Sequence, residues 1–188
     1  MKGAGAVTVD GIGAEAGFRR ATVASTDVVL GVLDEAARWL GSRGVSQWPP
    51  RFEAAWVEGA ISRGETWLVD VAGKAAGTVT LDWSDPLWAD TPGSAAYVHR
   101  MAVCRWAAGL GGVILTWAAA TARDQGAGAL RLDCVSSNTG LRAYYEAAGF
   151  THRGDAPVGG APGQRADEGP VTWVSRYELP LGTDGLAD

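Results

Sequence analysis

Apolar and polar positions follow two different periods along the chain, and these periods predict helices and strands. Apolar residues recur every three or four positions after Ser25 and again after Gly109, which is typical of amphipathic helices. A third helix is expected after the proline pair at 49–50, and a short fourth helix between 138 and 149. Shorter apolar runs predict strands at 18–23, 67–71, 78–83, 95–104, 130–135 and 172–179.

The order of these elements predicts an α/β fold with a mixed sheet. The strands at 67–71 and 78–83 are close enough in sequence to form a hairpin. Between 95 and 135 a strand, a helix and a strand follow one another, as in a parallel β-α-β unit. We therefore expect one central sheet, with antiparallel and parallel pairs, flanked by helices.

The length of 188 residues suits a single domain. We expect this domain to span 17–180, with a loosely ordered tail at 1–16 that holds a short strand near 6–9, and a second tail at 181–188. The stretch 154–170 contains five glycines and three prolines, which no periodic element tolerates. A loop of that length inside a compact domain is usually functional or mobile, so we expect a mobile loop there.

Charge and composition exclude several function classes. The net charge of −5 and the pI near 5.0 disfavour binding to nucleic acid or to an anionic membrane surface. The two cysteines, Cys104 and Cys134, and the two histidines, His99 and His152, do not have the spacing of a zinc site, so no metal is expected. Both cysteines are expected to be small buried residues. No apolar run approaches the ~20 residues of a membrane span, and no signal-peptide pattern is visible, which predicts a cytoplasmic protein.

A glycine-rich turn joins a strand directly to a helix at 107–112, with the sequence AAGLGG. Glycines at such a turn let backbone N–H groups approach an anion at the positive end of the helix. The turn is not a dinucleotide fingerprint, because Ile114 stands where the last glycine of GxGxxG would be, and it is not a P-loop. By itself the turn is explained equally well by close packing of the helix on the strand.

A second motif, N-x6-Y-x3-G-F, runs from 138 to 150. A helix that begins at Asn138 places Tyr145 two turns later, and Gly149 suits the position just after the helix end. Phe150 would then enter the core.

Together, V-x5-G-L-G-G at 103–112 and N-x6-Y-x3-G-F at 138–150 resemble the motifs of the GCN5-related N-acetyltransferase (GNAT) superfamily. The resemblance extends over about 18–179. It implies that acyl-CoA, here acetyl-CoA, lies between two parallel strands that splay apart, namely 95–104 and 130–135. It implies that the pyrophosphate contacts the loop at 106–112. The cofactor-binding residues expected on this basis are Met101, Ala102, Val103, Arg105, Ala108, Gly109, Leu110, Gly111, Gly112, Asn138 and Tyr144.

One position departs from the family pattern. The family loop usually has Arg or Gln three residues before the first glycine, and here that residue is Trp106. Either Arg105 reaches the pyrophosphate, or backbone amides alone hold it.

The resemblance also implies catalytic residues. Tyr145 matches the family's general acid, although a tyrosine on a helix face also serves as a packing residue. His99 matches a position that often carries Glu in relatives, so it is a candidate base; a silent structural histidine is the alternative. Strand alternation would place Tyr97, His99, Met101 and Val103 on one face. Asp82 on the neighbouring strand is a second candidate base, and the backbone N–H near Val103 would stabilise the oxyanion.

The resemblance also implies that two loops, 41–50 and 84–94, flank the acceptor site. Its candidate residues are Trp48, Asp82, Trp88 and Tyr97. With Asp85, Asp90 and Glu53 they would suit a cationic, partly apolar amine, and surface packing of the tryptophans is an equal alternative.

The expected function is therefore direct transfer of an acetyl group from acetyl-CoA to a small-molecule amine. A protein or peptide acetyltransferase, a non-catalytic CoA-binding module and a different acyl donor are the alternatives. A homodimer is possible, because relatives often form one.

Overall fold

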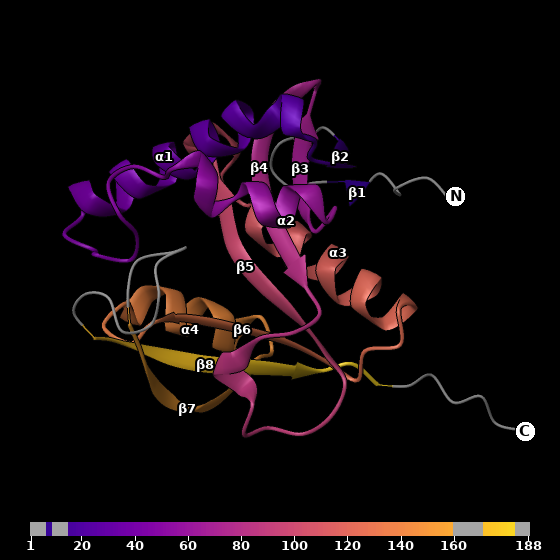
Figure 1. Ribbon diagram of the computed structural model, residues 1–188, viewed down its shortest axis with the longest axis vertical. Coiled ribbons are helices and arrows are strands. Elements are labelled where there is room, and N and C mark those ends of the chain that lie inside the picture. Colours follow the sequence, from indigo (N-terminus) through magenta and orange to yellow (C-terminus); the bar gives the residue numbers. More distant parts are fainter. Residues whose placement is uncertain (1–6, 9–14, 160–170, 183–188) are drawn as a thin grey trace, which may run out of the picture.

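The structure is a computed structural model that describes residues 7–8, 15–159 and 171–182. Strands of one sheet follow the order β1-β2-β3-β4-β5-β6-β8-β7 (Figure 1). The strands are β1 (Val7–Thr8), β2 (Glu15–Arg20), β3 (Thr66–Val71), β4 (Lys74–Asp82), β5 (Ala95–Val103), β6 (Ala129–Val135), β7 (Thr151–Val158) and β8 (Thr172–Pro180). The helices are α1 (Thr26–Ser42), α2 (Glu58–Ser62), α3 (Leu110–Asp124) and α4 (Thr139–Ala147), with short 3₁₀ turns at Val23–Ser25, Ala54–Trp56, Pro86–Trp88 and Arg105–Ala107.

The sheet is mixed, as the order of elements predicts. Neighbouring strands from β1 to β5 are antiparallel, β5 and β6 are parallel, and β6, β8 and β7 are again antiparallel. The parallel connection from β5 to β6 runs through α3, because a crossover between parallel strands needs a helix-length segment.

The two parallel strands pair over only part of their length. Their register runs from Ala95 opposite Ala129 to Val98 opposite Leu132 and ends there. Beyond that point β5 stays paired with β4, and β6 stays paired with β8. The edges that β5 and β6 turn toward each other therefore separate, and this separation opens the middle of the sheet.

A β-bulge lies at the start of the separation. Thr78 of β4 pairs with Ala102, but Thr80 pairs with His99, so β5 contains one extra residue there. Arg100, in that stretch, has a φ of 49°. Ala96 and Val98 precede the bulge.

The bulge reverses the faces of the residues that follow. Met101 and Val103 pack in the same core cluster as Ala96 and Val98, whereas Ala102 packs on the other face. The prediction that Tyr97 and His99 share a face with Met101 and Val103 was therefore wrong, because simple alternation does not continue through a bulge.

Helices cover both faces of the sheet. On one face Leu110, Ile114 and Ala118 of α3 pack against the strands, and on the other face Val29 and Leu33 of α1 do so. These α1 and α3 residues recur at helical spacing, which is why the sequence pattern identified both helices. Figure 1 shows α1 and α2 beside β2 to β5, and α4 beside β6 to β8. No helix within the described residues is long and apolar enough to cross a bilayer.

The segment after Pro49-Pro50 does not form the expected helix. It remains irregular as far as the turn at Ala54–Trp56, and only the five residues of α2 are α-helical. The backbone N–H of Phe52 donates a hydrogen bond of 2.8 Å to Asp34 Oδ1 of α1. This donor is therefore used for a contact with α1 and not for a hydrogen bond within a helix.

The expected loop at 154–170 is a strand in its first part. Residues 154–158 belong to β7, and residues 160–170 lie outside the described residues. A register shift between His152 and Asp155, with Gly154 at a φ of 92°, accommodates the glycine. Pro157 is tolerated because β7 is the outermost strand of the sheet. The strand expected at 18–23 corresponds to β2, which begins earlier, at Glu15. The short strand expected near 6–9 corresponds to β1, and most of the predicted tails otherwise lie outside the described residues.

Gly77 of β4 provides a test of the packing between sheet and α3. A Cβ there would lie 2.9 Å from the Ala102 carbonyl oxygen and 3.3 Å from Ile114 Cδ1. We expect Gly77→Ala to lower the free energy of unfolding by about 1–3 kcal/mol, because the clash involves backbone. Gly31→Ala in α1 is the matched control: its Cβ would meet nothing within 4 Å, and the change should raise stability by up to about 1 kcal/mol. Urea unfolding measures both, and equal effects would contradict this packing.

Candidate active site

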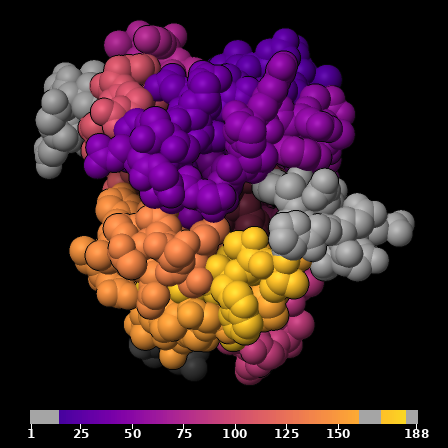
Figure 2. Space-filling model, turned by 90° about the vertical axis from the view of Figure 1, so that its left-hand side faces the viewer, coloured from indigo at the N-terminus to yellow at the C-terminus, as the bar shows by residue number. Residues whose placement is uncertain are grey.

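A cavity of about 940 Å³ opens where β5 and β6 separate. Its walls come from the C-terminal half of α1 and the loop after it, from β5 beyond Val98, from Asp133 of β6, and from the first two turns of α4. Figure 2 shows the surface hollowed between the indigo N-terminal segment and the orange and yellow C-terminal segments. Segments far apart in sequence therefore meet at this one opening.

Many of the residues predicted from sequence line this cavity. They come from the loop after α1, from the ends of β4 and β5, and from α4. The predicted residues in the lining are Trp48, Asp82, His99, Met101, Ala102, Val103, Asn138, Tyr144 and Tyr145. Within this stretch, the edge of β5 that faces β6 has no strand partner beyond Val98. An extended ligand could pair with that edge in the way an added strand does.

Trp88 and Tyr97 do not line the cavity, in contrast to the prediction. Trp88 is only 2% exposed, and the guanidinium carbons of Arg131 and Arg176 lie 5.0 and 5.2 Å from its ring centroid. The Tyr97 hydroxyl accepts a hydrogen bond of 3.2 Å from Arg131 Nη1. Arg131 is buried and also forms an ion pair of 2.8 Å with Glu178. Because a buried charge requires partners, the two aromatic residues enclose Arg131 instead of facing an acceptor.

The glycine-rich turn lies beside the cavity and leads into α3. Gly109 has a φ of 98°, which favours glycine, and α3 begins at the next residue. A Cβ on Gly111 would lie 2.7 Å from the Tyr144 hydroxyl oxygen, so the Tyr144 hydroxyl packs directly against the backbone of Gly111. Small residues at the N-terminus of a 15-residue helix fit the requirements of a phosphate-binding turn.

The side chain of Arg105 packs against α1. Its guanidinium carbon lies 4.7 Å from the centroid of the Trp39 ring, and its backbone N–H donates to Glu35 Oε1 at 2.8 Å. Trp106 is 42% exposed, and Lys74 Nζ lies 4.6 Å from its ring centroid. Of the two alternatives from sequence, this geometry favours a turn that works through its backbone amides.

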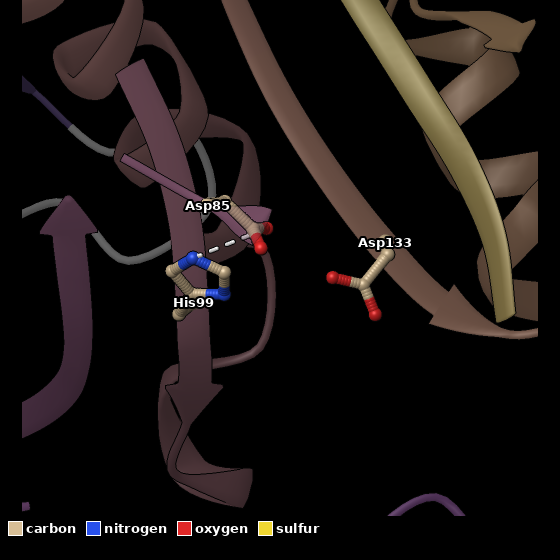
Figure 3. Close-up of side chains that lie close together, drawn as sticks. All are labelled: Asp85, His99 and Asp133. Carbon is tan, nitrogen blue, oxygen red and sulfur yellow. Dashed lines mark ion pairs between the residues drawn. The ribbon is translucent and has the colours of Figure 1, made fainter. Parts of the chain in front are cut away.

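Asp85, His99 and Asp133 converge on the point where the strands separate (Figure 3). His99 and Asp133 each come directly after the last residue that pairs β5 with β6, so they face each other across the opening. Asp85 Oδ2 lies 3.6 Å from His99 Nε2, and donor atoms of all three residues lie within 4.8 Å of one another. Three such groups could hold a metal ion, since catalytic sites often use three protein ligands, and the absence of a metal stays a prediction.

Burial and charge alter the acid–base behaviour of groups in the cavity. Burial raises the pKa of Asp133 to about 6, with a further increase from Asp85 and an opposing decrease from His99. Burial also raises the pKa of Tyr145, which is 5% exposed, and the neighbouring Cys134 and Asp133 add to this effect. Tyr145 therefore keeps its proton at neutral pH, while Asp133 can change its charge not far below it.

Asn138 positions α4 at the mouth of the cavity. Its Oδ1 accepts a hydrogen bond of 3.1 Å from the Leu141 N–H, which caps the helix, and its Nδ2 donates to Gln47 Oε1 at 3.3 Å. This second contact connects α4 to the loop after α1. A contact between Asn138 and a CoA arm stays a prediction.

Both cysteines are buried, as expected from sequence. Burial is the largest cause that raises the pKa of Cys104 to about 11 and that of Cys134 to about 12. Thiols with these pKa values carry almost no thiolate at neutral pH, so neither is a ready nucleophile.

Sequence reasoning missed Asp133 and Arg100, which also line the cavity. Asp133 is the only acidic residue of β6, and a carboxylate in a strand whose residues are mostly buried is a signal that could have drawn attention. Arg100 lies in the bulge and its Nε has no hydrogen-bond partner among the described residues. No sequence pattern identifies that bulge.

Comparison with known proteins agrees with this geometry. Residues 33–150 match the model of the acetyltransferase (GNAT) family, and this span includes both sequence motifs. The chain belongs to the GNAT family. A relative from Bacillus subtilis (strain 168), the uncharacterized N-acetyltransferase YesJ, is 30% identical over 137 residues, which cover 67% of this chain and 76% of YesJ. The protein is accordingly an N-acetyltransferase.

Solved structures show the same GNAT architecture. A GNAT acetyltransferase from Listeria monocytogenes 4b F2365 superposes with a TM-score of 0.74 and 25% identity, covering 94% of this chain and all of the other. The putative acetyltransferase yncA from Salmonella typhimurium, solved with its cofactor acetyl-CoA, has a TM-score of 0.61 and 18% identity, covering 92% and 98% of the two chains.

The raised pKa of Asp133 predicts a stability effect that depends on pH in this GNAT protein. The folded state holds the proton more tightly than the unfolded chain, whose carboxyl has its ordinary pKa of 3.8. The carboxyl therefore lowers the stability of the fold progressively as the pH rises from 3.8 to about 6, and the full loss remains at higher pH. We expect Asp133→Asn to raise the free energy of unfolding at pH 8 by an amount on the order of 2 kcal/mol, and to change it little near pH 4.

Urea unfolding at the two pH values measures this difference. Asp124→Asn, at an exposed position near the end of α3, is the control and should change stability at neither pH. A gain from Asp133→Asn that is the same at both pH values would show that the ionised carboxylate is not the cause.

Proposed function

We propose that this enzyme transfers an acetyl group directly from acetyl-CoA to the amine of a small molecule. The observation that carries the proposal is the unpaired edge of β5, which lies in the same cavity as His99 and Tyr145. A donor along that edge would bring its reactive end to these two side chains.

The donor side of the cavity fits an acyl-CoA. The β5 edge offers backbone groups to an extended arm, and the turn with Gly109 and Gly111 offers N–H groups to a diphosphate. The yncA structure, which has the same fold, contains acetyl-CoA. The bound thioester would supply an activated acetyl group, and we assign to it the residues Met101, Ala102, Val103, Ala108, Gly109, Leu110, Gly111, Gly112, Asn138 and Tyr144.

The acceptor must lose a proton before it can attack. A free alkylamine has a pKa of about 10.4, so it enters the cavity as an ammonium ion. His99 can accept that proton, because it lines the cavity next to Asp85, which would stabilise the resulting imidazolium. Tyr145 keeps its proton at neutral pH and can donate it to the departing thiolate, whose conjugate thiol has a pKa of about 8.5.

The cysteines support direct transfer over a covalent acyl-enzyme. Both thiols of the chain are buried and have strongly raised pKa values. A thiol in that state is a poor nucleophile for a thioester.

The form and charge of the cavity support a small cationic acceptor. Trp39 and Trp48 line it on the α1 side, and Asp82, Asp85 and Asp133 bring acidic groups to it. Aromatic walls and carboxylates suit a cationic amine. A cavity that is enclosed by several elements is more suitable for a small molecule than for a protein chain.

Release of free CoA thiol from acetyl-CoA, measured with a panel of small amines and with lysine-containing peptides, tests the function. We expect turnover with at least one small amine. Turnover with peptides alone would show a protein acetyltransferase. Binding of acetyl-CoA by calorimetry without turnover of any acceptor would identify a CoA-binding module.

Tyr145→Phe tests the general acid. We expect kcat to fall by about 10²-fold or more, because acid catalysis contributes on the order of 10²–10⁴ in rate. The KM for acetyl-CoA should change little, since the ring remains in place among Phe150 and Tyr177. Steady-state kinetics measures both, and a loss of kcat below about threefold would remove Tyr145 from this role.

A further inference from the structure

The three side chains at the opening of the sheet have a geometry that suits one particular chemical group. Three atoms that lie within 4.8 Å of one another always have a common point no more than about 2.8 Å from each. That distance is the usual length of a charge-assisted hydrogen bond. The separation of 3.6 Å between Asp85 Oδ2 and His99 Nε2 is longer than a direct hydrogen bond, so this pair does not satisfy itself.

The backbone holds these groups in place. Asp85 Oδ1 accepts a hydrogen bond of 2.9 Å from the Leu87 N–H, which leaves Oδ2 directed at His99. His99 and Asp133 lie on strands of the central sheet, at the first positions beyond the parallel pairing. Figure 3 shows the Asp133 carboxylate directed from β6 toward the other two side chains. Arg176, which pairs with Asp133 in register, binds Asp90, and Arg131 of the same strand as Asp133 binds Glu178.

A primary ammonium group matches this arrangement. It carries three N–H donors on one nitrogen, and two carboxylates with a neutral imidazole nitrogen provide three acceptors. A secondary ammonium has only two N–H donors and would place a carbon atom against one acceptor. A buried carboxylate left without its hydrogen bond is unfavourable, so the secondary amine is disfavoured.

We infer that Asp85, His99 and Asp133 form a three-point binding site for the ammonium group of a primary amine, and that Asp133 determines this specificity. The inference rests on the proposed function. One N–H bond of the ammonium breaks and its proton passes to His99, where the two carboxylates flank the imidazolium. The amine lone pair then forms the C–N bond as the C–S bond breaks, and Tyr145 protonates the thiolate. The new amide nitrogen gives up a second proton, which restores the Tyr145 hydroxyl, and His99 releases its proton to solvent.

Equilibrium binding tests this site independently of turnover. Isothermal titration calorimetry of the CoA-saturated protein would use phenethylamine beside its N-methyl derivative, and 1,4-diaminobutane beside its N,N′-dimethyl derivative, in which both nitrogens are N-methylated. We expect at least one primary amine to bind about tenfold or more tightly than its N-methyl derivative, which corresponds to one hydrogen bond to a charged group. Equal affinities within each pair, or no binding of either primary amine, would overturn the inference.

The variant Asp133→Asn tests whether Asp133 causes the preference for a primary amine over its N-methyl derivative. We expect it to weaken binding of the primary amine about tenfold and to reduce the preference over the N-methyl derivative. The affinity for CoA should stay within about twofold, because the variant keeps its fold and the β5 edge. Asp124→Asn, far from the cavity lining, should leave all of these affinities unchanged. A preference that persists in Asp133→Asn would contradict the assignment.

These outcomes separate the inference from the proposed function. Primary-amine binding that depends on Asp133, with no release of CoA thiol from acetyl-CoA, would support the binding site and refute the acetyl transfer. Turnover of primary and N-methyl amines with equal kcat/KM would support the acetyl transfer and refute the three-point site for primary amines.

Discussion

The hydrogen bonds between β5 and β6 stop after Val98 and Leu132, and the site depends on that interruption. A sheet whose central strands remained paired would have no room for a ligand in its middle. Each strand keeps its outer partner, so the opening does not leave either strand unsupported. The β-bulge in β5 contributes, because an extra residue bends the strand and increases its twist where the pairing ends.

A buried charge network lies at the end of the opening where β5 and β6 are still paired. Arg131 pairs in register with Tyr97 of β5 on one side and with Glu178 of β8 on the other, and its side chain contacts both. Removing one partner of such a network is strongly unfavourable, because it leaves a charge without compensation. The network thus joins three strands just before two of them diverge. The acidic and basic groups of the cavity lie immediately beyond it, on strands whose positions are already determined.

Much of the fold could be predicted from the sequence, because its helices and strands carry clear apolar periods. Both long helices and most strands lie close to where the pattern placed them. The bulge could not be predicted, since it depends on how β4 pairs with β5 and not on the sequence of β5 alone. The strand at Thr151–Val158 was missed because its glycine and proline are tolerated only at a sheet edge with a bulge.

The same limits apply to the site. Motifs identified the cavity residues that belong to one local segment, such as Asn138, which caps α4, and Tyr145 within α4. They did not place Trp88, whose position is set by the distant Arg131 and Arg176, or Asp133, which acquires its role only when β6 lies beside the end of β5.

The contact between Tyr144 and the backbone of Gly111 has a consequence for how the family can diverge. The tyrosine hydroxyl occupies the space that a side chain at 111 would need. A lineage that acquired any larger residue at 111 would have to shorten or displace the aromatic ring at 144 as well. Homologous sequences should therefore show the two positions changing together, even though they are 33 positions apart along the chain.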